Sequence, residues 1–214
     1  MKKKTPRRTQ ASSKEKLLQR QQEVRHQKII LGCITAAALI LLFLIFVLPK
    51  FSKNTGTLKD VNEDVLRYQS QVEAWCSEFN IEEYSTLMLA IMQQESSGQG
   101  TDVFQCSESP FNTWYTNEPN SITDIDYSIR VGVETFAYCL SMAGCESIQD
   151  TDLLKVAIQE YNFGNDYATW ALDNFGGYSL ENAAQYSAMM QERLGWSSYG
   201  DIEYVPHVLR YIDF

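Results

Sequence analysis

Glu95 is the residue whose type and position most clearly suggest chemistry. It lies eleven residues after Tyr84 and continues the apolar stripe of a predicted helix. The stripe contains Leu87, Met88, Ile91 and Met92. A carboxyl group among apolar neighbours has a raised pKa, so that it can hold a proton near neutral pH and act as a general acid. The helix is expected to end at Ser96, leaving the acid beside a cleft; the alternative is a solvated glutamate at a frayed helix end.

Three short strings, in this order, give Glu95 a context. Residues 94–98 (QESSG) resemble the helix-ending "ES" motif of lysozyme-like lytic transglycosylases and goose-type lysozymes. Residues 102–105 (DVFQ) resemble their "GLMQ" element, and residues 157–164 (AIQEYNFG) resemble their "A-x-x-A-Y-N-x-G" element. Each string alone is weak, whereas all three in order favour this superfamily.

The whole of residues 60–214 is most similar to the CwlT-like lysozyme domain of cell-wall hydrolases carried on Gram-positive conjugative elements. In that group the acid-bearing helix leads into a "DV-x-Q-x-SES" string, which here is residues 102–109 (DVFQCSES). The closing residues 200–209 (GDIEYVPHVL) also look like that group. The resemblance implies a mainly α, lysozyme-like helical globular domain with a substrate groove.

The resemblance also implies roles for individual residues. Glu95 would protonate the glycosidic oxygen of the bond between N-acetylmuramic acid and N-acetylglucosamine in peptidoglycan. Gln105 and Ser107 would bind sugar or position water. Tyr161 and Asn162 would form the opposite wall, with their polar ends directed to the saccharide and to Glu95. The competing interpretation makes Tyr161 a core aromatic and Gln105 an ordinary loop residue.

A second carboxylate would decide between two reactions. A hydrolase usually uses a second acid to activate water or stabilise the oxocarbenium ion, and Glu108 and Asp102 are the candidates closest in sequence to Glu95. A site with one acid could instead let the muramoyl 6-hydroxyl attack, as in a lytic transglycosylase. The resemblance favours hydrolysis slightly and leaves both open. Members of the group often carry a peptidase domain as well; because the sequence ends at Phe214, peptide cleavage is not expected.

The elements that position these residues are predicted to be helices. One long amphipathic helix covers residues 61–79, with Asp60 or Asn62 as its N-cap. Further helices cover residues 84–94, 126–142, 151–162 and 180–194, and Pro206 suits a short terminal helix. Gly144 is expected to stop the third helix, and Ser179 to cap the fifth. Strand patterns are scarce, with at most a short piece at residues 102–105.

The N-terminal part differs in charge from the rest of the chain. Residues 1–28 contain ten Lys and Arg against two Glu, whereas the remainder contains 18 − 10 = 8 basic and 27 − 2 = 25 acidic residues. Residues 29–48 are a run of 20 residues without a charge, which as a helix would span roughly 30 Å, one hydrocarbon thickness. We therefore expect a basic cytoplasmic tail (1–28), a transmembrane anchor (29–48), a polar linker (49–59) and an extracellular domain (60–214). A cleaved signal peptide is the alternative.

The remaining composition narrows the cofactors and partners. The predicted extracellular part has four cysteines and one histidine, His207, without a CxxC motif, so no metal or other cofactor is expected. One disulfide among Cys76, Cys106, Cys139 and Cys145 is plausible, and Cys106 is interpreted as structural rather than nucleophilic. Beside a membrane span, the basic tail is interpreted as a topology determinant that contacts lipid, and not as a nucleic-acid arm.

The expected function is thus local cleavage of peptidoglycan glycan strands, for conjugative transfer or secretion, with channel proteins as possible partners. The alternative is an inert glycan-binding or scaffold subunit of such an apparatus. That reading would keep groove aromatics, for which Trp114, Tyr115, Trp170 and Tyr178 are the candidates, but it would not need an acid at Glu95.

Overall fold

The computed structural model describes residues 55–164 and 166–214, and of the N-terminal part residues 20, 25, 28, 30–32 and 34–40. The chain divides into two units, Met1–Lys53 and Asn54–Phe214. In the first unit, residues 34–40 are helical; the predicted basic tail, apart from residues 20, 25 and 28, and half of the predicted anchor lie outside the described residues. Among the residues described, no helix has the length and apolar character needed to cross a membrane.

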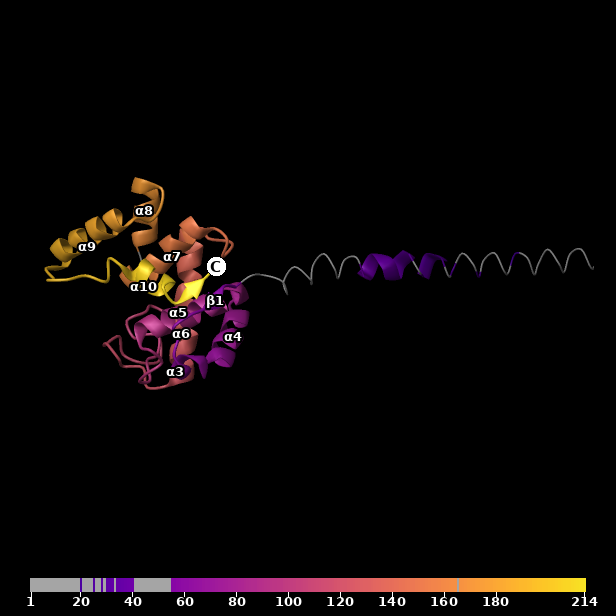
Figure 1. Cartoon of the computed structure of the whole chain (residues 1–214), viewed down its shortest axis with the longest axis horizontal. Helices are drawn as coiled ribbons and strands as arrows, with labels where there is room; N and C mark the ends of the chain where they lie inside the picture. Colours follow the sequence, from indigo (N-terminus) through magenta and orange to yellow (C-terminus); the bar gives the residue numbers. More distant parts are fainter. Residues whose placement is uncertain are drawn as a thin grey trace, which may run out of the picture. The chain divides into compact units, whose positions relative to one another are not determined.

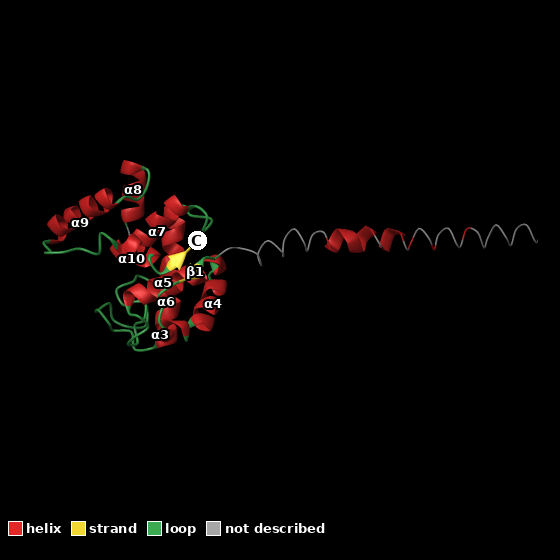
Figure 2. Ribbon diagram, in the orientation of Figure 1, coloured by secondary structure: helices red, strands yellow, loops and turns green. Residues whose placement is uncertain are grey.

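The second unit is built mainly from helices joined by loops (Figures 1 and 2). In chain order its elements are β1 (Thr57–Leu58), α3 (Glu63–Leu66), α4 (Gln69–Glu78), the 3₁₀ helix η1 (Glu82–Tyr84), α5 (Ser85–Glu95), α6 (Ile125–Ala143), α7 (Thr151–Phe163), α8 (Tyr167–Phe175), α9 (Leu180–Leu194), α10 (Tyr204–Leu209) and β2 (Ile212–Asp213). The mainly helical class predicted from the sequence is confirmed.

Local capping signals set most of the helix ends. The side chain of Asn62 accepts a hydrogen bond from the amide of Val65, so Asn62 and not Asp60 is the N-cap of α3. Ser179 forms a reciprocal capping box with Asn182 at the start of α9. Gly144 ends α6 in the left-handed conformation, with a φ of 67°. The sequence could predict these helix ends because each one depends on residues that are close together in the chain.

Three local features differ from what the sequence led us to expect. The long helix over residues 61–79 is divided into α3 and α4, with the break at Arg67 and Tyr68. At this break the loop after α5 crosses α3: the guanidinium of Arg67 donates to the carbonyl of Gly98 at 3.1 Å, and a Cβ on Gly98 would lie 2.5 Å from the carbonyl oxygen of Asp64. Helix α8 was not predicted, and residues 102–105 form a turn instead of a strand.

The strands β1 and β2 lie near the two ends of the second unit. Leu58 pairs with Ile212 and Thr57 with Asp213 in an antiparallel ladder, and Lys59 forms an ion pair with Asp213. The last part of the predicted linker therefore belongs to the folded unit. Sequence gave no signal for this pairing because each strand has only two residues and its partner is distant.

The apolar side chains form two clusters. The larger one surrounds α5, whose residues Leu87 to Met92 are all buried, and it extends to α4, α6, α7 and α10. The smaller one, half of it aromatic, joins α8 to α9 and the end of α7; it consists of Phe163, Tyr167, Ala171, Ala183, Tyr186 and Met190. Cys76, Cys106, Cys139 and Cys145 are all buried and free, so the plausible disulfide among them is not formed.

Candidate active site

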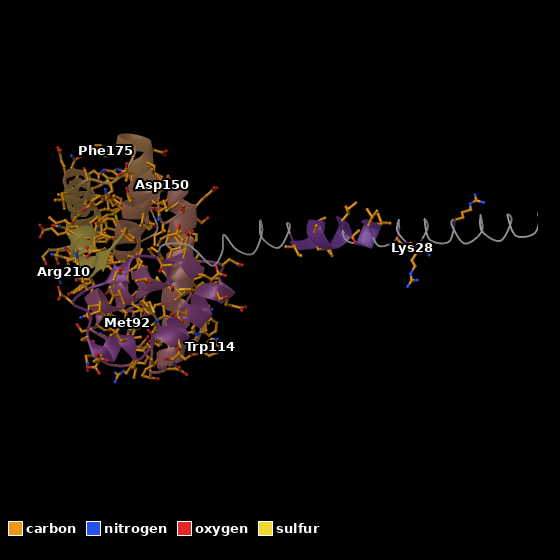
Figure 3. All side chains as sticks on the ribbon, turned by 45° about the vertical axis from the view of Figure 1, so that its right-hand side comes forward. Lys28, Met92, Trp114, Asp150, Phe175 and Arg210 are labelled. Atoms are coloured by element: carbon orange, nitrogen blue, oxygen red, sulfur yellow. The ribbon has the colours of Figure 1, made fainter. Side chains whose placement is uncertain are left out.

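Glu95 is the last residue of α5, and its side chain is half-buried. The hydroxyl of Tyr204, from α10, donates a hydrogen bond to the Oε1 atom of Glu95. Helix α5 can bring a carboxyl group into this apolar setting because the preceding turns bury Ile91 and Met92 in the main cluster. Met92 lies inside the folded unit, as Figure 3 shows.

The surroundings of Glu95 favour its neutral form. Burial raises its pKa from 4.5 to about 7. The negative charges of Asp102 and Asp201 act in the same direction, whereas the hydrogen bond from Tyr204 lowers the pKa because it stabilises the carboxylate. A carboxyl group with this pKa is protonated in a substantial fraction of molecules near neutral pH and can donate that proton, as a general acid must.

Asp102 organises the loop that follows α5. Its carboxylate is buried and accepts hydrogen bonds from the amides of Cys106 (3.1 Å) and Ser107 (3.0 Å) and from the hydroxyls of Ser107 (2.6 Å) and Ser128 (2.8 Å). The hydroxyl of Ser107 also accepts from the amide of Ile122 at 3.2 Å. Asp102 and Ser107 are thus engaged with the protein in this structure, and the loop is tied to α6.

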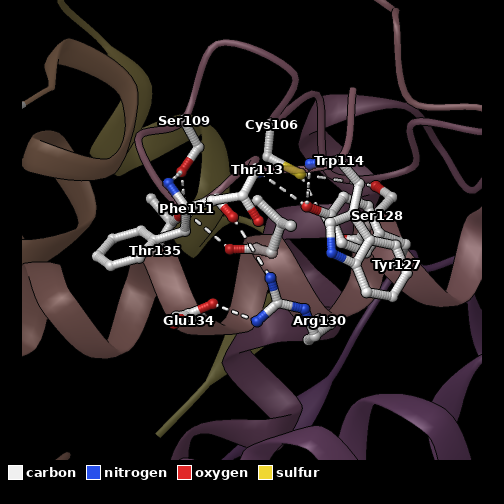
Figure 4. A network of polar contacts seen from close by, with 11 residues as sticks. Cys106, Ser109, Phe111, Thr113, Trp114, Tyr127, Ser128, Arg130, Glu134 and Thr135 are labelled. Carbon is white, nitrogen blue, oxygen red and sulfur yellow. Dashed lines mark hydrogen bonds and ion pairs between the residues drawn. The ribbon is translucent and has the colours of Figure 1, made fainter. Parts of the chain in front are cut away.

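The thiol of Cys106 also belongs to this network, and Figure 4 shows it beside Ser128. It is 3.4 Å from the Oδ1 atom of Asp102 and 3.4 Å from the carbonyl oxygen of Ser128. Burial, together with the charge of Asp102, holds the pKa of this thiol well above its usual range. Cys106 is therefore a packed thiol, in agreement with its structural interpretation.

Gln105 is exposed in the same loop and has a left-handed backbone, with a φ of 47°. Its side-chain amide donates to the carbonyl of Asp102 at 2.9 Å and to the side-chain oxygen of Asn120 at 3.0 Å. These two bonds use both amide hydrogens and leave the side-chain oxygen as an acceptor.

Tyr161 and Asn162, near the end of α7, fasten other segments to the site. The Tyr161 hydroxyl donates to the carbonyl of Phe104 at 3.1 Å, and its ring is nearly parallel to that of Tyr204, with centroids 6.5 Å apart. Burial keeps the pKa of Tyr161 well above 10. The side-chain oxygen of Asn162 accepts from the amide of Asp201 at 2.6 Å. Neither polar end bonds Glu95; Tyr204 takes that place.

The C-terminal segment supplies groups that sequence reasoning did not assign. Tyr204 is the hydrogen-bond partner of Glu95, and Asp201 is one of the charges that raise its pKa. Two contacts hold Asp201. The Nδ1 atom of His207 lies 2.6 Å from the Oδ2 atom of Asp201, and the side-chain amide of Gln159 donates to the backbone carbonyl of Asp201 at 2.9 Å. The only available signal was the string at residues 200–209, which gave no role to either residue.

A groove of about 600 Å³ lies beside these residues. Its lining includes Gln105, Glu108, Tyr161 and Asn162 from the predicted site, and it does not include Glu95, Asp102 or Ser107. Another part of the lining comes from α9 and the segment that follows it, including Met190, Arg193, Leu194, Trp196 and Tyr199.

The predicted groove aromatics do not line this groove. Trp114 and Tyr115 pack against Tyr127, at centroid distances of 4.5 Å and 5.5 Å. Trp170 and Tyr178 pack against the smaller cluster. An aromatic residue type alone does not reveal which way its side chain faces.

Comparison with known proteins agrees with this arrangement. The family model described as lysozyme-like matches residues 62–211, which include α3 to α10. The chain belongs to the lysozyme-like family. The segments that this match covers carry Glu95, the loop at Asp102, the end of α7 and Tyr204, so the site described above lies within the family domain.

Individual relatives show the same relation. The bifunctional muramidase/DL-endopeptidase CwlT of Bacillus subtilis is 32% identical over 149 residues, covering 70% of this chain and 42% of its own length. The uncharacterized membrane protein YocA, also of Bacillus subtilis, is 31% identical over 73% of this chain and 71% of its own length. A crystal structure of a lipoprotein-like NLP/P60 family protein from Staphylococcus aureus superposes with a TM-score of 0.61 at 30% identity, over 72% of this chain and 54% of that one. The chain thus spans less than half of CwlT.

Proposed function

We propose that the protein is a peptidoglycan glycosidase that cleaves the bond between N-acetylmuramic acid and N-acetylglucosamine. One observation carries the proposal: a half-buried carboxyl group, Glu95, has its pKa raised to about 7 beside residues that line a groove. The similarity of the domain to CwlT, which is named a muramidase, supports this substrate.

In the proposed mechanism Glu95 donates its proton to the glycosidic oxygen as the bond to the sugar ring breaks. The hydroxyl of Tyr204 already points to Oε1 and stabilises the carboxylate that this step creates. The charges of Asp102 and Asp201, which raise the pKa of Glu95, also favour positive charge nearby. They would therefore stabilise the oxocarbenium-like transition state.

For the second half of the reaction we propose hydrolysis with Glu108 as the second carboxylate. Glu108 is exposed and lines the groove, where a carboxylate could orient a water molecule. Asp102 is the other candidate, but four donors already occupy its two oxygens. We assign Asp102 an electrostatic role and the task of shaping the loop that presents Gln105.

We further propose that residues 29–48 anchor the protein in the cell membrane, with the N-terminus in the cytoplasm and the domain outside. The uncharged run of 20 residues after a basic tail supports this, and so does the name of YocA as a membrane protein. Tethered cleavage would open the wall locally, as a conjugation or secretion channel requires. An inert glycan-binding subunit is the second candidate; it would use the groove but would have no need for a carboxyl group whose pKa is raised.

The test is digestion of purified peptidoglycan by the full chain in detergent, with the released muropeptides identified by mass. Glu95→Gln is expected to reduce release by about 100-fold or more, because general acid catalysis contributes about 10²–10⁴-fold. Glu78→Gln is the matched control, since Glu78 also ends a helix but is exposed. Reducing muramic ends would indicate hydrolysis, whereas anhydro muramic ends would indicate transglycosylation. No release by the unaltered protein, or equal release by Glu95→Gln, would contradict the proposal.

A further inference from the structure

Two exposed aromatic side chains line the groove and have no part in the proposed catalytic step. Its lining includes Tyr138 from α6 and Trp196 from the segment after α9, and both are exposed aromatics. The exposed fraction is 57% for Trp196 and 38% for Tyr138. Exposed aromatic side chains that line a groove are available to contact a bound ligand.

The backbone around Trp196 is held in place rather than left loose. Gly195 ends α9 with a left-handed φ of 68°, and the amide of Trp196 donates to the carbonyl of Gln191 at 3.1 Å. Three residues later the carbonyl of Tyr199 accepts from the hydroxyl of Ser187 at 2.6 Å, and the rings of Trp196 and Tyr199 have centroids 6.1 Å apart. The indole is thus presented by a braced segment.

Tyr199 and its neighbour connect this segment to α7. The hydroxyl of Tyr199 donates to the carbonyl of Phe163. Gly200 packs so closely on α7 that a Cβ there would overlap the ring of Phe163, and it would also lie 2.8 Å from the side-chain oxygen of Asn162. The segment that carries Trp196 is therefore fixed to the same turn of α7 that carries Tyr161 and Asn162.

The charges around the groove favour an uncharged occupant. Glu108 and Asp166 line it, together with Glu160, whose pKa is raised to about 7 by burial, against a single cationic side chain in the described lining, Arg193. Negatively charged groups would be repelled here, whereas a neutral sugar such as N-acetylglucosamine would not. A pyranose also has a C–H face that packs on an aromatic ring and hydroxyls that remain hydrated at the edge, which suits an indole with one apolar face and a polar N–H.

We propose that Trp196 and Tyr138 form a saccharide subsite that holds a sugar of the glycan strand away from the bond being cleaved. The groove is continuous between these rings and the residues Gln105, Tyr161 and Asn162, so one strand can contact both. This inference rests on the proposed function for the identity of the strand. It adds that the enzyme selects extended glycan strands over short fragments.

The test compares strand lengths, using the full chain in detergent and soluble glycan strands from a tetrasaccharide upwards. Trp196→Ala is expected to raise KM for long strands by about tenfold, equivalent to about 1.4 kcal/mol of binding free energy, with kcat within about twofold. Cleavage of the tetrasaccharide should be unchanged, and Trp196→Tyr should restore most of the affinity for long strands. Tyr138→Ala should act in the same direction.

Trp114→Ala is the matched control. Trp114 is 74% exposed but stacks on Tyr127 with an interplanar angle of 14° and does not line the groove, so its loss should change none of these values. A KM for long strands that is the same in Trp196→Ala and the unaltered protein would overturn the subsite. An equal loss on all lengths would also overturn it, because a general structural effect would then explain the result.

Binding to Glu95→Gln separates this proposal from the enzymatic one. Long strands should bind this variant, and adding Trp196→Ala should weaken that binding about tenfold. If the unaltered protein cleaves nothing but this weakening is observed, the subsite stands and the proposed reaction fails. If cleavage occurs and the binding is not weakened, the reaction stands and the subsite is refuted.

Discussion

Replacing Tyr204 by phenylalanine isolates the contribution of one hydrogen bond to the acid at Glu95. The substitution removes the hydroxyl that donates to Oε1 and keeps the ring, whose centroid is 6.5 Å from that of Tyr161. Because the hydroxyl stabilises the carboxylate, it lowers the pKa of Glu95 against the larger effect of burial. Its loss should therefore raise that pKa, and it should leave the burial of the carboxyl group almost unchanged.

The size of the change follows from the strength of such bonds. A hydrogen bond to a charged group contributes about 1.5–3 kcal/mol, and about 1.4 kcal/mol corresponds to one pH unit in a pKa. The protonated carboxyl group also gains from the hydroxyl, so only part of this energy distinguishes the two forms. We expect the pKa of Glu95 to move from about 7 to about 8.

The assay is the pH dependence of kcat/KM on soluble glycan strands, which reports the ionisation of the free enzyme. A general acid must be protonated, so activity falls as the pH rises through its pKa. In Tyr204→Phe this basic limb should move to higher pH by about one pH unit, while activity at low pH decreases because the carboxylate product is less stabilised. Tyr211→Phe is the control, since the Tyr211 ring packs under Arg210. A basic limb that does not move, or that moves to lower pH, would refute the assigned role of Tyr204.

Two further predictions concern stability, both measured by urea denaturation of the full chain in detergent. Gly132→Ala should destabilise the domain by about 1–3 kcal/mol, because the new Cβ would overlap the ring of Phe104. The control Ser141→Ala, on the exposed face of α6, should have little effect. Equal free energies of unfolding for the two variants would show that the core adjusts to the added methyl group. For Glu95 the folded pKa of about 7 lies above 4.5, so its stabilising contribution is complete below pH 4.5 and is lost as the pH rises through 7. Between pH 4 and pH 8, the free energy of unfolding of Glu95→Gln should therefore rise by up to about 3 kcal/mol relative to that of the unaltered protein. A difference in unfolding free energy that stays constant across this range would contradict the raised pKa.

Much of the fold could be predicted because its signals are local. The stripe before Glu95, the cap at Ser179 and the stop at Gly144 all depend on residues within one or two turns, and the structure has the helices they indicate. Helix α8 could not be found in this way. The side chain of its N-cap, Asp166, makes no capping bond, and the amide of Ala168 in its first turn is satisfied by the carboxylate of Glu160, from α7, at 2.7 Å.

The environment of the acid shows the same division. The apolar stripe predicted a carboxyl group in apolar surroundings, and the raised pKa of Glu95 confirms that expectation. Its hydrogen-bond partner lies 109 residues away in the sequence, so no spacing rule could indicate Tyr204. The loop at Asp102 gave a different difficulty: a carboxylate there could serve chemistry or hold backbone amides, and only the observed donors distinguish these uses.

The dependence of Glu95 on Tyr204 and Asp201 connects its acidity to the closure of the domain. Both residues come from the C-terminal segment, where α10 packs against α5 and β2 pairs with β1. Without that segment the end of α5 would lose its cover, and water would return the pKa of Glu95 toward 4.5. The same segment continues from the one that presents Trp196 to the groove. In the proposed enzyme, a single stretch of chain from α9 to the C-terminus therefore has two tasks. It covers Glu95 and so raises the pKa of the proton donor, and it supplies residues of the groove that hold the strand.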